Sequence, residues 1–221
     1  MRPPGVDPDE LARRVGLLRD RIEAAGGDPE RVTVVGVTKG FSAEVVPLAV
    51  GAGLVDLGES YAQEAVGKFP LAPDGVRWHW IGRMQRNKVR QVADRVALWH
   101  SVDRRSLGVE IARRAPGAAV LVQVNTSGEE TKGGCASADA PGLVADLRAE
   151  GLEVRGLMTI AAPDPDAARV EFRALRGLAD DLGLAERSMG MSEDLDLAVA
   201  EGATIVRIGT ALFGPRTPGR G

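Results

Sequence analysis

Short apolar runs alternate with helical stretches along almost the whole chain. The runs are rich in Val, Ile and Leu, and most are bounded by glycine or polar residues. This alternation predicts repeated βα units around a parallel sheet. The eight candidate strands are Val32–Thr38, Leu54–Gly58, Val76–Ile81, Ala97–Val102, Ala119–Asn125, Val154–Ile160, Glu186–Gly190 and Thr204–Ile208.

A helix is predicted before the first strand, over about residues 7–26. Asp7 can cap it, Pro8 suits its first position, and Glu10 completes a spacing like that of a capping box. The glycines at 26 and 27 end it. Its predicted apolar face consists of Leu11, Val15, Leu18 and Ile22.

A second clear helix follows the sixth candidate strand. Asp164 can cap it, and Pro165 stands at its first position. Its apolar residues at every fourth position predict the face that packs on the sheet. These residues are Val170, Ala174, Leu178 and Leu182.

Eight βα units in about 180 residues favour a compact TIM-type (β/α)8 barrel over an open doubly wound sheet. The chain contains neither G-x-G-x-x-G nor G-x-x-x-x-G-K-[ST], so those routes to nucleotide binding are not expected. We expect one α/β domain over residues 1–221, with an added N-terminal helix and a short tail at 216–221.

Composition and charge limit the classes of molecule that this protein is expected to bind. A net charge of -3 gives no reason to expect nucleic acid, and no run approaches the roughly 18 apolar residues of a membrane span. Cys135 is the only cysteine and the N-terminal segment lacks the apolar core of a signal peptide, which favours a cytoplasmic location. His79 and His100 show no zinc-site spacing, so we expect packing or surface histidines and no metal. A small-molecule partner and a monomer are expected.

Two loops of the barrel suit phosphate. Active sites of this fold lie at the C-terminal ends of the strands, and phosphate is frequently held after strands seven and eight. Those loops begin with Gly190-Met191-Ser192 and with Gly209-Thr210. Small residues let backbone N–H groups approach an anion, and hydroxyls add donors. Alternatively, Ser192 is the N-cap of the helix that follows.

Lys39 ends the first strand, where its amine would point toward the barrel mouth. It is either a solvated lysine or a partly desolvated amine that can form an imine with an aldehyde. Arg207, in the eighth strand, needs a partner if it points inward, and an outward side chain could extend between helices instead. Because arginine is a known partner of the ring nitrogen of pyridoxal 5′-phosphate (PLP), the lysine, the arginine and the two loops together favour PLP.

Several segments along the chain, taken together in their order and spacing, are typical of one protein family. They are Gly36-Val37-Thr38-Lys39, Leu57-Gly58-Glu59-Ser60-Tyr61 with Gln63-Glu64, Trp80-Ile81-Gly82 with Gln85 and Asn87-Lys88, Val124-Asn125 with Lys132 and Gly134, Arg155-Gly156-Leu157-Met158, Ser188-Met189-Gly190-Met191-Ser192, and Val206-Arg207-Ile208-Gly209-Thr210 with Phe213-Gly214. From about Val32 to Pro215 the chain resembles the pyridoxal phosphate homeostasis protein family, which shares its barrel with the N-terminal domain of alanine racemase.

The resemblance implies a role for each main site residue. Lys39 would carry PLP as a Schiff base, and Ser192, Gly209 and Thr210 would hold its phosphate. Arg207 would face the pyridine nitrogen.

Three further positions follow from the resemblance. Asn87 and Met158 would line the ring pocket, and Lys132 resembles a second lysine that accepts or passes on PLP. Alternatively, Lys132 is a solvated residue of a glycine-rich loop. The clear departure is Ser60, where the family typically has asparagine, a longer side chain with an amide donor.

The resemblance also implies a PLP carrier or reservoir in vitamin B6 and amino-acid homeostasis, with PLP-dependent apo-enzymes as recipients and no catalytic turnover. A racemase of the related fold needs a second acid/base, and Tyr61 is the only tyrosine of this chain. An arginine beside the ring nitrogen also makes PLP a poorer electron sink. The alternatives are a small amino-acid racemase and a lysine-imine aldolase that acts on a phosphorylated sugar.

Overall fold

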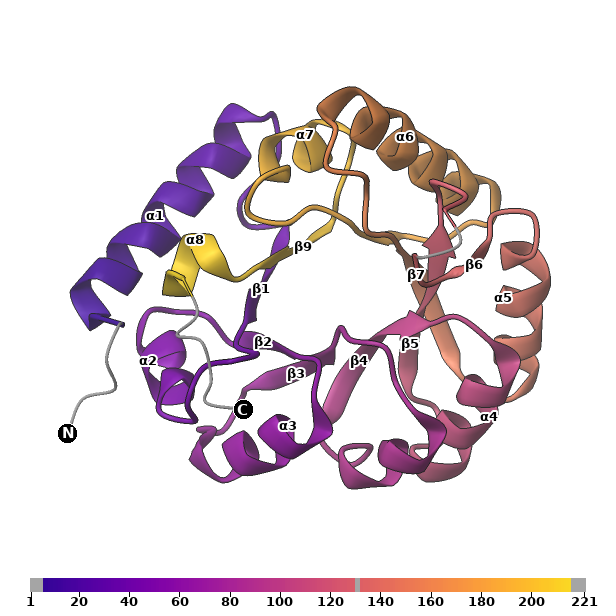
Figure 1. Cartoon of the computed structure of the whole chain (residues 1–221), viewed down its shortest axis with the longest axis horizontal. Helices are drawn as coiled ribbons and strands as arrows, with labels where there is room; N and C mark the ends of the chain where they lie inside the picture. The colour runs from indigo at the N-terminus through magenta and orange to yellow at the C-terminus, as the bar shows by residue number, and fades with distance from the viewer. Residues whose placement is uncertain (1–5, 130–131, 216–221) are drawn as a thin grey trace.

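The computed structural model describes residues 6–129 and 132–215, and eight parallel strands in it form a closed barrel (Figure 1). The strands run in the order β4-β3-β2-β1-β9-β8-β7-β5, and pairing of β4 with β5 closes the ring. Their bounds are β1 Thr33–Val37, β2 Asp56–Glu59, β3 Arg77–Trp80, β4 Val96–Val102, β5 Ala119–Asn125, β7 Glu153–Met158, β8 Glu186–Ser188 and β9 Ile205–Ile208. The predicted TIM-type barrel is therefore confirmed.

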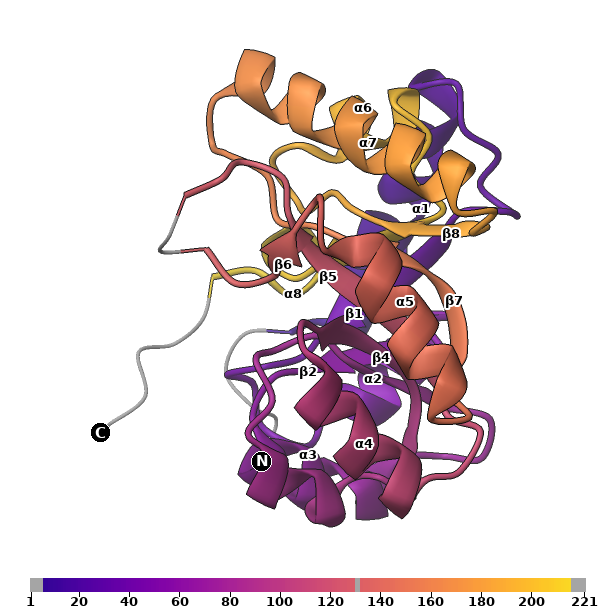
Figure 2. The same ribbon diagram turned by 90° about the vertical axis from the view of Figure 1, so that its right-hand side faces the viewer.

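Helices surround the barrel, and one more strand is added to it. The short β6 (Cys135–Ala136), which the sequence did not predict, pairs with β5 apart from the ring. Figure 2 shows α4 and α5 packed beside β4 and β5. The helices are α1 Pro8–Ala24, α2 Val45–Gly51, α3 Ala62–Lys68, α4 Arg105–Arg114, α5 Ala140–Ala149, α6 Pro165–Asp181, α7 Leu195–Ala200 and α8 Thr210–Phe213, with 3-10 turns η1 Phe69–Leu71 and η2 Arg86–Gln91. The predicted tail at 216–221 lies outside the described residues.

Helix α1 begins as predicted. Asp7 Oδ1 accepts hydrogen bonds of 3.0 Å from the backbone N–H groups of Asp9 and Glu10. These bonds satisfy two N–H groups that have no partner inside the helix. The predicted face of Leu11, Val15, Leu18 and Ile22 is buried.

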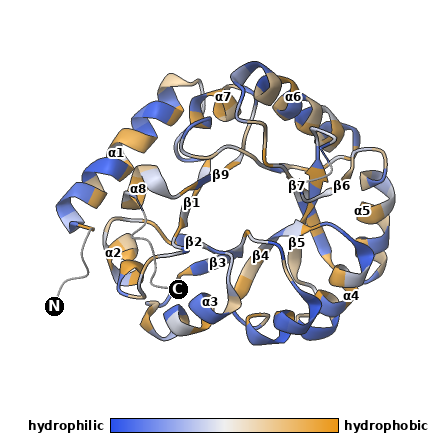
Figure 3. Ribbon diagram, in the orientation of Figure 1, coloured by the Kyte–Doolittle hydropathy of each residue, from blue (hydrophilic) through white to orange (hydrophobic). Residues whose placement is uncertain are grey.

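The predicted face of α6 is wrong in its first half. Val170 is 67% exposed and Ala174 is exposed, whereas Leu178 and Leu182 are partly buried and pack against the core. The fully buried residues include Ala168, Phe172, Leu175 and Ala179. A strict spacing of four residues drifts around a helix that turns every 3.6 residues, so it does not mark one side over several turns. Figure 3 shows hydrophobic and hydrophilic positions on opposite sides of the surrounding helices.

The apolar core lies in two layers. The larger layer fills the space between strands and helices and includes Trp78, Trp99 and Ile208. A small separate cluster is formed by Val35, Leu98, Ala119, Leu121, Met158 and Ile205. Because neighbours in a strand face opposite sides, residues between outward positions point into the barrel. In the described part of the chain, no helix is both long enough and apolar enough to cross a membrane.

Gly156 allows β7 to lie close against the backbone of β8. A Cβ at Gly156 would lie 1.9 Å from the backbone oxygen of Glu186 in β8. We expect Gly156→Ala to lower the free energy of unfolding by about 1–3 kcal/mol, because β7 and β8 must separate. Urea unfolding measures this change. Gly177→Ala, on the open side of α6, is the control and should be neutral or slightly stabilising. Equal unfolding midpoints for both variants would contradict the strand contact.

Candidate functional site

Lys39 lies at the end of β1, between two cavities at the barrel mouth. The first cavity, of about 500 Å³, is lined by Lys39 together with Ser192, Arg207, Gly209 and Thr210. The second, of about 670 Å³, shares Lys39, Ile81 and Ile160 with the first. The structure therefore brings together the five residues that the sequence analysis assigned to one site.

Ser192 joins the two loops that were expected to lie side by side. Its Oγ accepts a hydrogen bond of 3.2 Å from the backbone N–H of Ala211, in the turn after β9. The alternative that Ser192 caps the next helix is wrong, because α7 begins at Leu195 after Asp194. Asp194 Oδ1 accepts from the Met191 N–H at 2.6 Å and closes this loop. Ser192 therefore stays in the loop that lines the first cavity.

Gly190 allows that loop to turn away from β8. Its φ is +94°, and a Cβ there would lie 2.5 Å from Cβ of Ala198 in α7. Both facts require glycine, since L residues with a side chain are strained in this region.

Arg207 points into the barrel, so the outward alternative is wrong. Its Nη1 donates to Ser188 Oγ and its Nη2 to the Thr159 carbonyl, both at 2.8 Å. Its neighbours Val206 and Ile208 belong to the outer apolar layer. Burial lowers the pKa of Arg207 to about 10, so the guanidinium remains charged at neutral pH.

The guanidinium of Arg207 can donate further hydrogen bonds. No described carboxylate forms an ion pair with it, and only two of its five N–H donors have described acceptors. Because Arg207 lines the first cavity, a ligand there with an acceptor atom would satisfy a buried cation.

Behind Arg207, a chain of polar side chains crosses the barrel. Ser188 Oγ lies 2.8 Å from His100 Nδ1, and His100 Nε2 lies 2.8 Å from His79 Nδ1. His79 Nε2 then lies 2.9 Å from Asp56 Oδ1. Both histidines are buried and hydrogen-bonded to each other, so neither is a surface residue.

The charged ends of this chain fix the direction of its outer hydrogen bonds. Burial lowers the pKa of His100 well below its ordinary value, and the charges of His79 and Arg207 add to the effect. Burial alone would raise the pKa of Asp56, but hydrogen bonds from His79 and from Arg77 leave it below its ordinary value. Arg207 therefore donates to Ser188 at one end of the chain, and the Asp56 carboxylate accepts from the Nε2–H of His79 at the other.

A buried ion pair holds the residue before Lys39. Lys68 Nζ donates to Glu59 Oε1 at 2.5 Å and to the Thr38 carbonyl at 2.7 Å. Thr38 Oγ1 donates to the same carboxylate oxygen at 2.6 Å. Burial raises the pKa of Glu59, against the charge and hydrogen bonding of Lys68. Removing one member would leave a buried charge unpaired, which typically costs about 3–5 kcal/mol.

The residue after Lys39 is held as well. The backbone N–H of Gly40 donates to Glu64 Oε2 at 2.7 Å. Glu64 lies in α3, as does Lys68. The backbone on both sides of Lys39 is therefore tied to β2 and α3, so the half-buried lysine starts from a fixed position.

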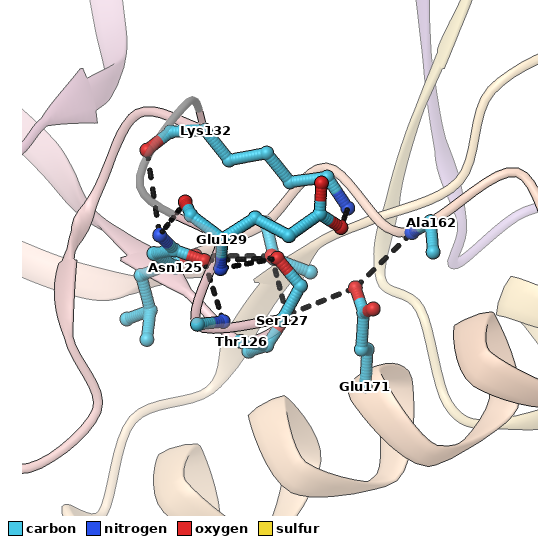
Figure 4. A network of polar contacts seen from close by, with 10 residues as sticks. Asn125, Thr126, Ser127, Glu129, Lys132, Ala162 and Glu171 are labelled. Atoms are coloured by element: carbon cyan, nitrogen blue, oxygen red, sulfur yellow. Dashed lines mark hydrogen bonds and ion pairs between the residues drawn. The ribbon is translucent and has the colours of Figure 1, made fainter.

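Three predicted site residues do not line either cavity. Asn87 is exposed on η2, and Met158 is buried in the inner apolar cluster. Lys132 lies in the loop after β5 with its Nζ 3.0 Å from Glu129 Oε1 (Figure 4). The same loop reaches the second cavity through Gly133.

Sequence reasoning missed the residues that support Lys39 and Arg207. The signal was present for the two histidines, because His79 stands between Trp78 and Trp80, and His100 follows Trp99. Strand alternation places such polar residues on the face opposite the large aromatic side chains. For Lys68 no such signal existed, because a lysine at the end of a short helix is usually solvated.

Known proteins match almost the whole chain. The profile of the alanine racemase N-terminal domain matches residues 6–217. A pyridoxal phosphate homeostasis protein of Pseudomonas aeruginosa is 44% identical, over 96% of this chain and 96% of its own. PipY of Synechococcus elongatus, solved with PLP bound, is 32% identical with a TM-score of 0.81, over 92% of this chain and all of that chain.

An alanine racemase of Clostridium difficile shares the fold. It is 17% identical with a TM-score of 0.78, and the match covers 96% of this chain but 58% of the racemase chain. The relatives above 30% identity match over nearly their whole length, which the racemase does not. The chain therefore belongs to the pyridoxal phosphate homeostasis protein family, within the alanine racemase N-terminal domain family.

Proposed function

We propose that this protein binds PLP in the first cavity, as an imine with Lys39, and carries or buffers it without turning over amino acids. The observation that carries the proposal is the meeting in one cavity of a lysine at a strand end, a buried arginine with unused donors and two hydroxyl-bearing loops. PipY, at 32% identity, holds PLP on the same fold. When bound, PLP supplies an aldehyde carbon that one amine can hold and another can take over.

The phosphate belongs at the Ser192 and Thr210 end of the cavity, in our proposal. Both residues line it beside Gly209, and hydroxyl and backbone donors suit an anion. Three acidic residues also line the cavity. Asp194 accepts from a backbone N–H, Asp196 pairs with Arg21 through two hydrogen bonds of 3.0 Å, and Glu193 is exposed to solvent.

Arg207 is proposed to donate to the ring nitrogen. Its orientation is fixed by Ser188 and the Thr159 carbonyl before any ligand arrives, so little ordering remains to be done on binding. A donor at this position keeps the ring nitrogen unprotonated, which weakens PLP as an electron sink for carbanions.

A weak racemase is the second candidate, because Tyr61 lines the second cavity beside Lys39. Racemisation needs a positioned acid/base on each face of the substrate carbon. Tyr61 is 60% exposed, and no described residue holds its hydroxyl. These features favour the carrier.

The remaining proposals rest on the membership of this chain in the same family. Residues 1–221 act as one domain and as a monomer in the cytoplasm, with PLP-dependent apo-enzymes as recipients. Asn87 and Met158 contribute to the ring site only indirectly, because neither lines the cavity. Lys132 is a second acceptor of PLP, reached from the loop that carries Gly133.

The assignment of Lys39 can be tested by spectroscopy and mass. PLP-loaded wild type should show the visible absorption band of an imine, and Lys39→Ala should lack it. Borohydride reduction of the wild type should place the pyridoxyl mass on the Lys39 peptide. Lys88→Ala and Lys132→Ala are matched lysine controls that should keep the band. A pyridoxyl label on another lysine of the intact wild type would show that Lys39 is not the carrier residue.

The phosphate site predicts a large difference between PLP and pyridoxal. The charged phosphate accepts several hydrogen bonds, so pyridoxal should bind at least about tenfold more weakly than PLP. The double variant Ser192→Ala/Thr210→Val should lose most of this difference. Ser137→Ala, exposed outside both cavities, is the control. Equal affinities of the wild type for the two compounds would refute the phosphate site.

Carrier and enzyme differ in turnover. Loss of one positioned acid/base costs roughly 100- to 10,000-fold in rate, so PLP-loaded protein should exceed free PLP only slightly with L-alanine. The reference reaction contains the Lys39→Ala variant and free PLP. A separate assay measures transfer of PLP from the wild type to an apo-enzyme. Turnover of even about one per second, within the ordinary range of enzymes, would establish the enzyme instead.

A further inference from the structure

The second cavity is not explained by the proposed PLP site. None of Ser192, Arg207, Gly209 and Thr210 lines it, yet Lys39 does. Its volume of about 670 Å³ exceeds that of the first cavity. A molecule bound there would lie beside the lysine amine without displacing the residues that hold phosphate and ring.

The charged side chains of this cavity are mainly cationic. Arg83 and Lys88 line it with Lys39, and neither Arg83 nor Lys88 forms an ion pair or side-chain hydrogen bond with a described residue. Asp103 is the only acidic side chain among its lining residues, and it is already paired with Arg104. The cavity therefore offers two cations without a described anionic partner, and this favours an anion.

Neutral polar groups complete the wall. Ser60, Gln85 and Gln123 line the cavity and can donate to a carboxylate. Trp80 also lines it, so its indole can report on a molecule bound there.

We propose that the second cavity binds a small primary amine that carries a carboxylate, an amino acid, and that this amine releases PLP from Lys39. The inference rests on the proposed function, because it needs PLP on Lys39. Arg83 and Lys88 hold the carboxylate, which leaves the amine of the same molecule next to the lysine.

The exchange balances without a further reactant. The incoming nitrogen forms the bond to the aldehyde carbon of PLP, and the bond from that carbon to Lys39 Nζ breaks. The incoming ammonium has three N–H protons and keeps one of them in the protonated imine. The other two end on Lys39 Nζ, which already carries the proton of its own imine and leaves as an ammonium. No electrons are transferred, so no oxidant or reductant is needed.

The charge of the cavity argues against direct release by a lysine side chain of another protein. A lysine ammonium would approach Arg83 and Lys88 with the same sign of charge, which is unfavourable in a partly enclosed space. An amino acid brings a carboxylate that compensates them.

The test compares glycine with glycinamide, which has an amine but no carboxylate. PLP-loaded full-length protein is incubated with each amine and quenched with borohydride, and the pyridoxyl mass on Lys39 is measured. Glycine should remove the label at lower concentration than glycinamide. The double variant Arg83→Gln/Lys88→Gln should need about tenfold more glycine, because two exposed charge contacts are lost. It should need the same or less glycinamide, because the charges that repel its ammonium are gone.

Matched controls separate a specific site from net charge. Arg86→Gln/Arg90→Gln removes the same charge from η2, the turn that also carries Lys88, and neither residue lines the cavity. It should behave as wild type. The PLP-free protein gives an independent signal, since glycine should shift the indole N–H resonance of Trp80 in the wild type but not in the Arg83/Lys88 variant.

The outcomes separate the two proposals. If Lys39 carries no label before an amine is added, the proposed function is wrong and this inference falls with it. If Lys39 is labelled but glycine and glycinamide act alike, or both double variants respond alike, only the amino-acid site is overturned. Faster label loss with the dication cadaverine than with glycine would assign release to lysine-like amines instead.

Discussion

A buried arginine that forms no ion pair with any described residue is the constraint on which the barrel interior depends. The charge of Arg207 is removed from water, which is unfavourable unless polar groups replace the lost solvent. Ser188 and the Thr159 carbonyl do so directly, and the histidine pair extends the hydrogen bonds to ionised Asp56. Polar side chains therefore occupy inward positions that apolar residues fill in most barrels of this type, and the inner apolar cluster is correspondingly small.

Hydrogen bonds to buried charged groups also fix the backbone next to Lys39. The buried pair of Lys68 and Glu59 would itself be costly, but each partner also bonds to Thr38, so their charges stabilise one conformation of the strand end. The Lys68–Glu59 pair adds little net stability by being ionic. The two buried networks instead place a lysine amine and a guanidinium at fixed points of one cavity before a ligand binds, which reduces the ordering cost of binding.

The sequence was informative where a pattern is local. Apolar runs alternating with helical stretches predicted all eight barrel strands, and the capping residues predicted the start of α1 at Asp7. The known geometry of strand ends predicted that Lys39 and Arg207 lie in one cavity. Sequence reasoning failed where a feature depends on packing between elements that are distant in the sequence. The buried face of α6 depends on how the helix is rotated against the sheet. Ser192 could have capped the next helix, but it lies in a loop that Asp194 closes. The Lys68–Glu59 pair joins α3 to β2 in a way that no local pattern encodes.

A carrier differs from an enzyme in what its site must keep fixed. Catalysis at the carbon next to the amine needs positioned groups on two faces, whereas carrying needs a firm hold on phosphate and ring together with an open path to the aldehyde. In this barrel the fixed elements, Arg207 and the Ser192 loop, lie on one side of Lys39, and the other side is a larger cavity in which Tyr61 is mostly exposed. In our proposals, an amine enters that side without disturbing Arg207 and the Ser192 loop. The first cavity would then determine which cofactor is bound, and the second would determine which amine can release it.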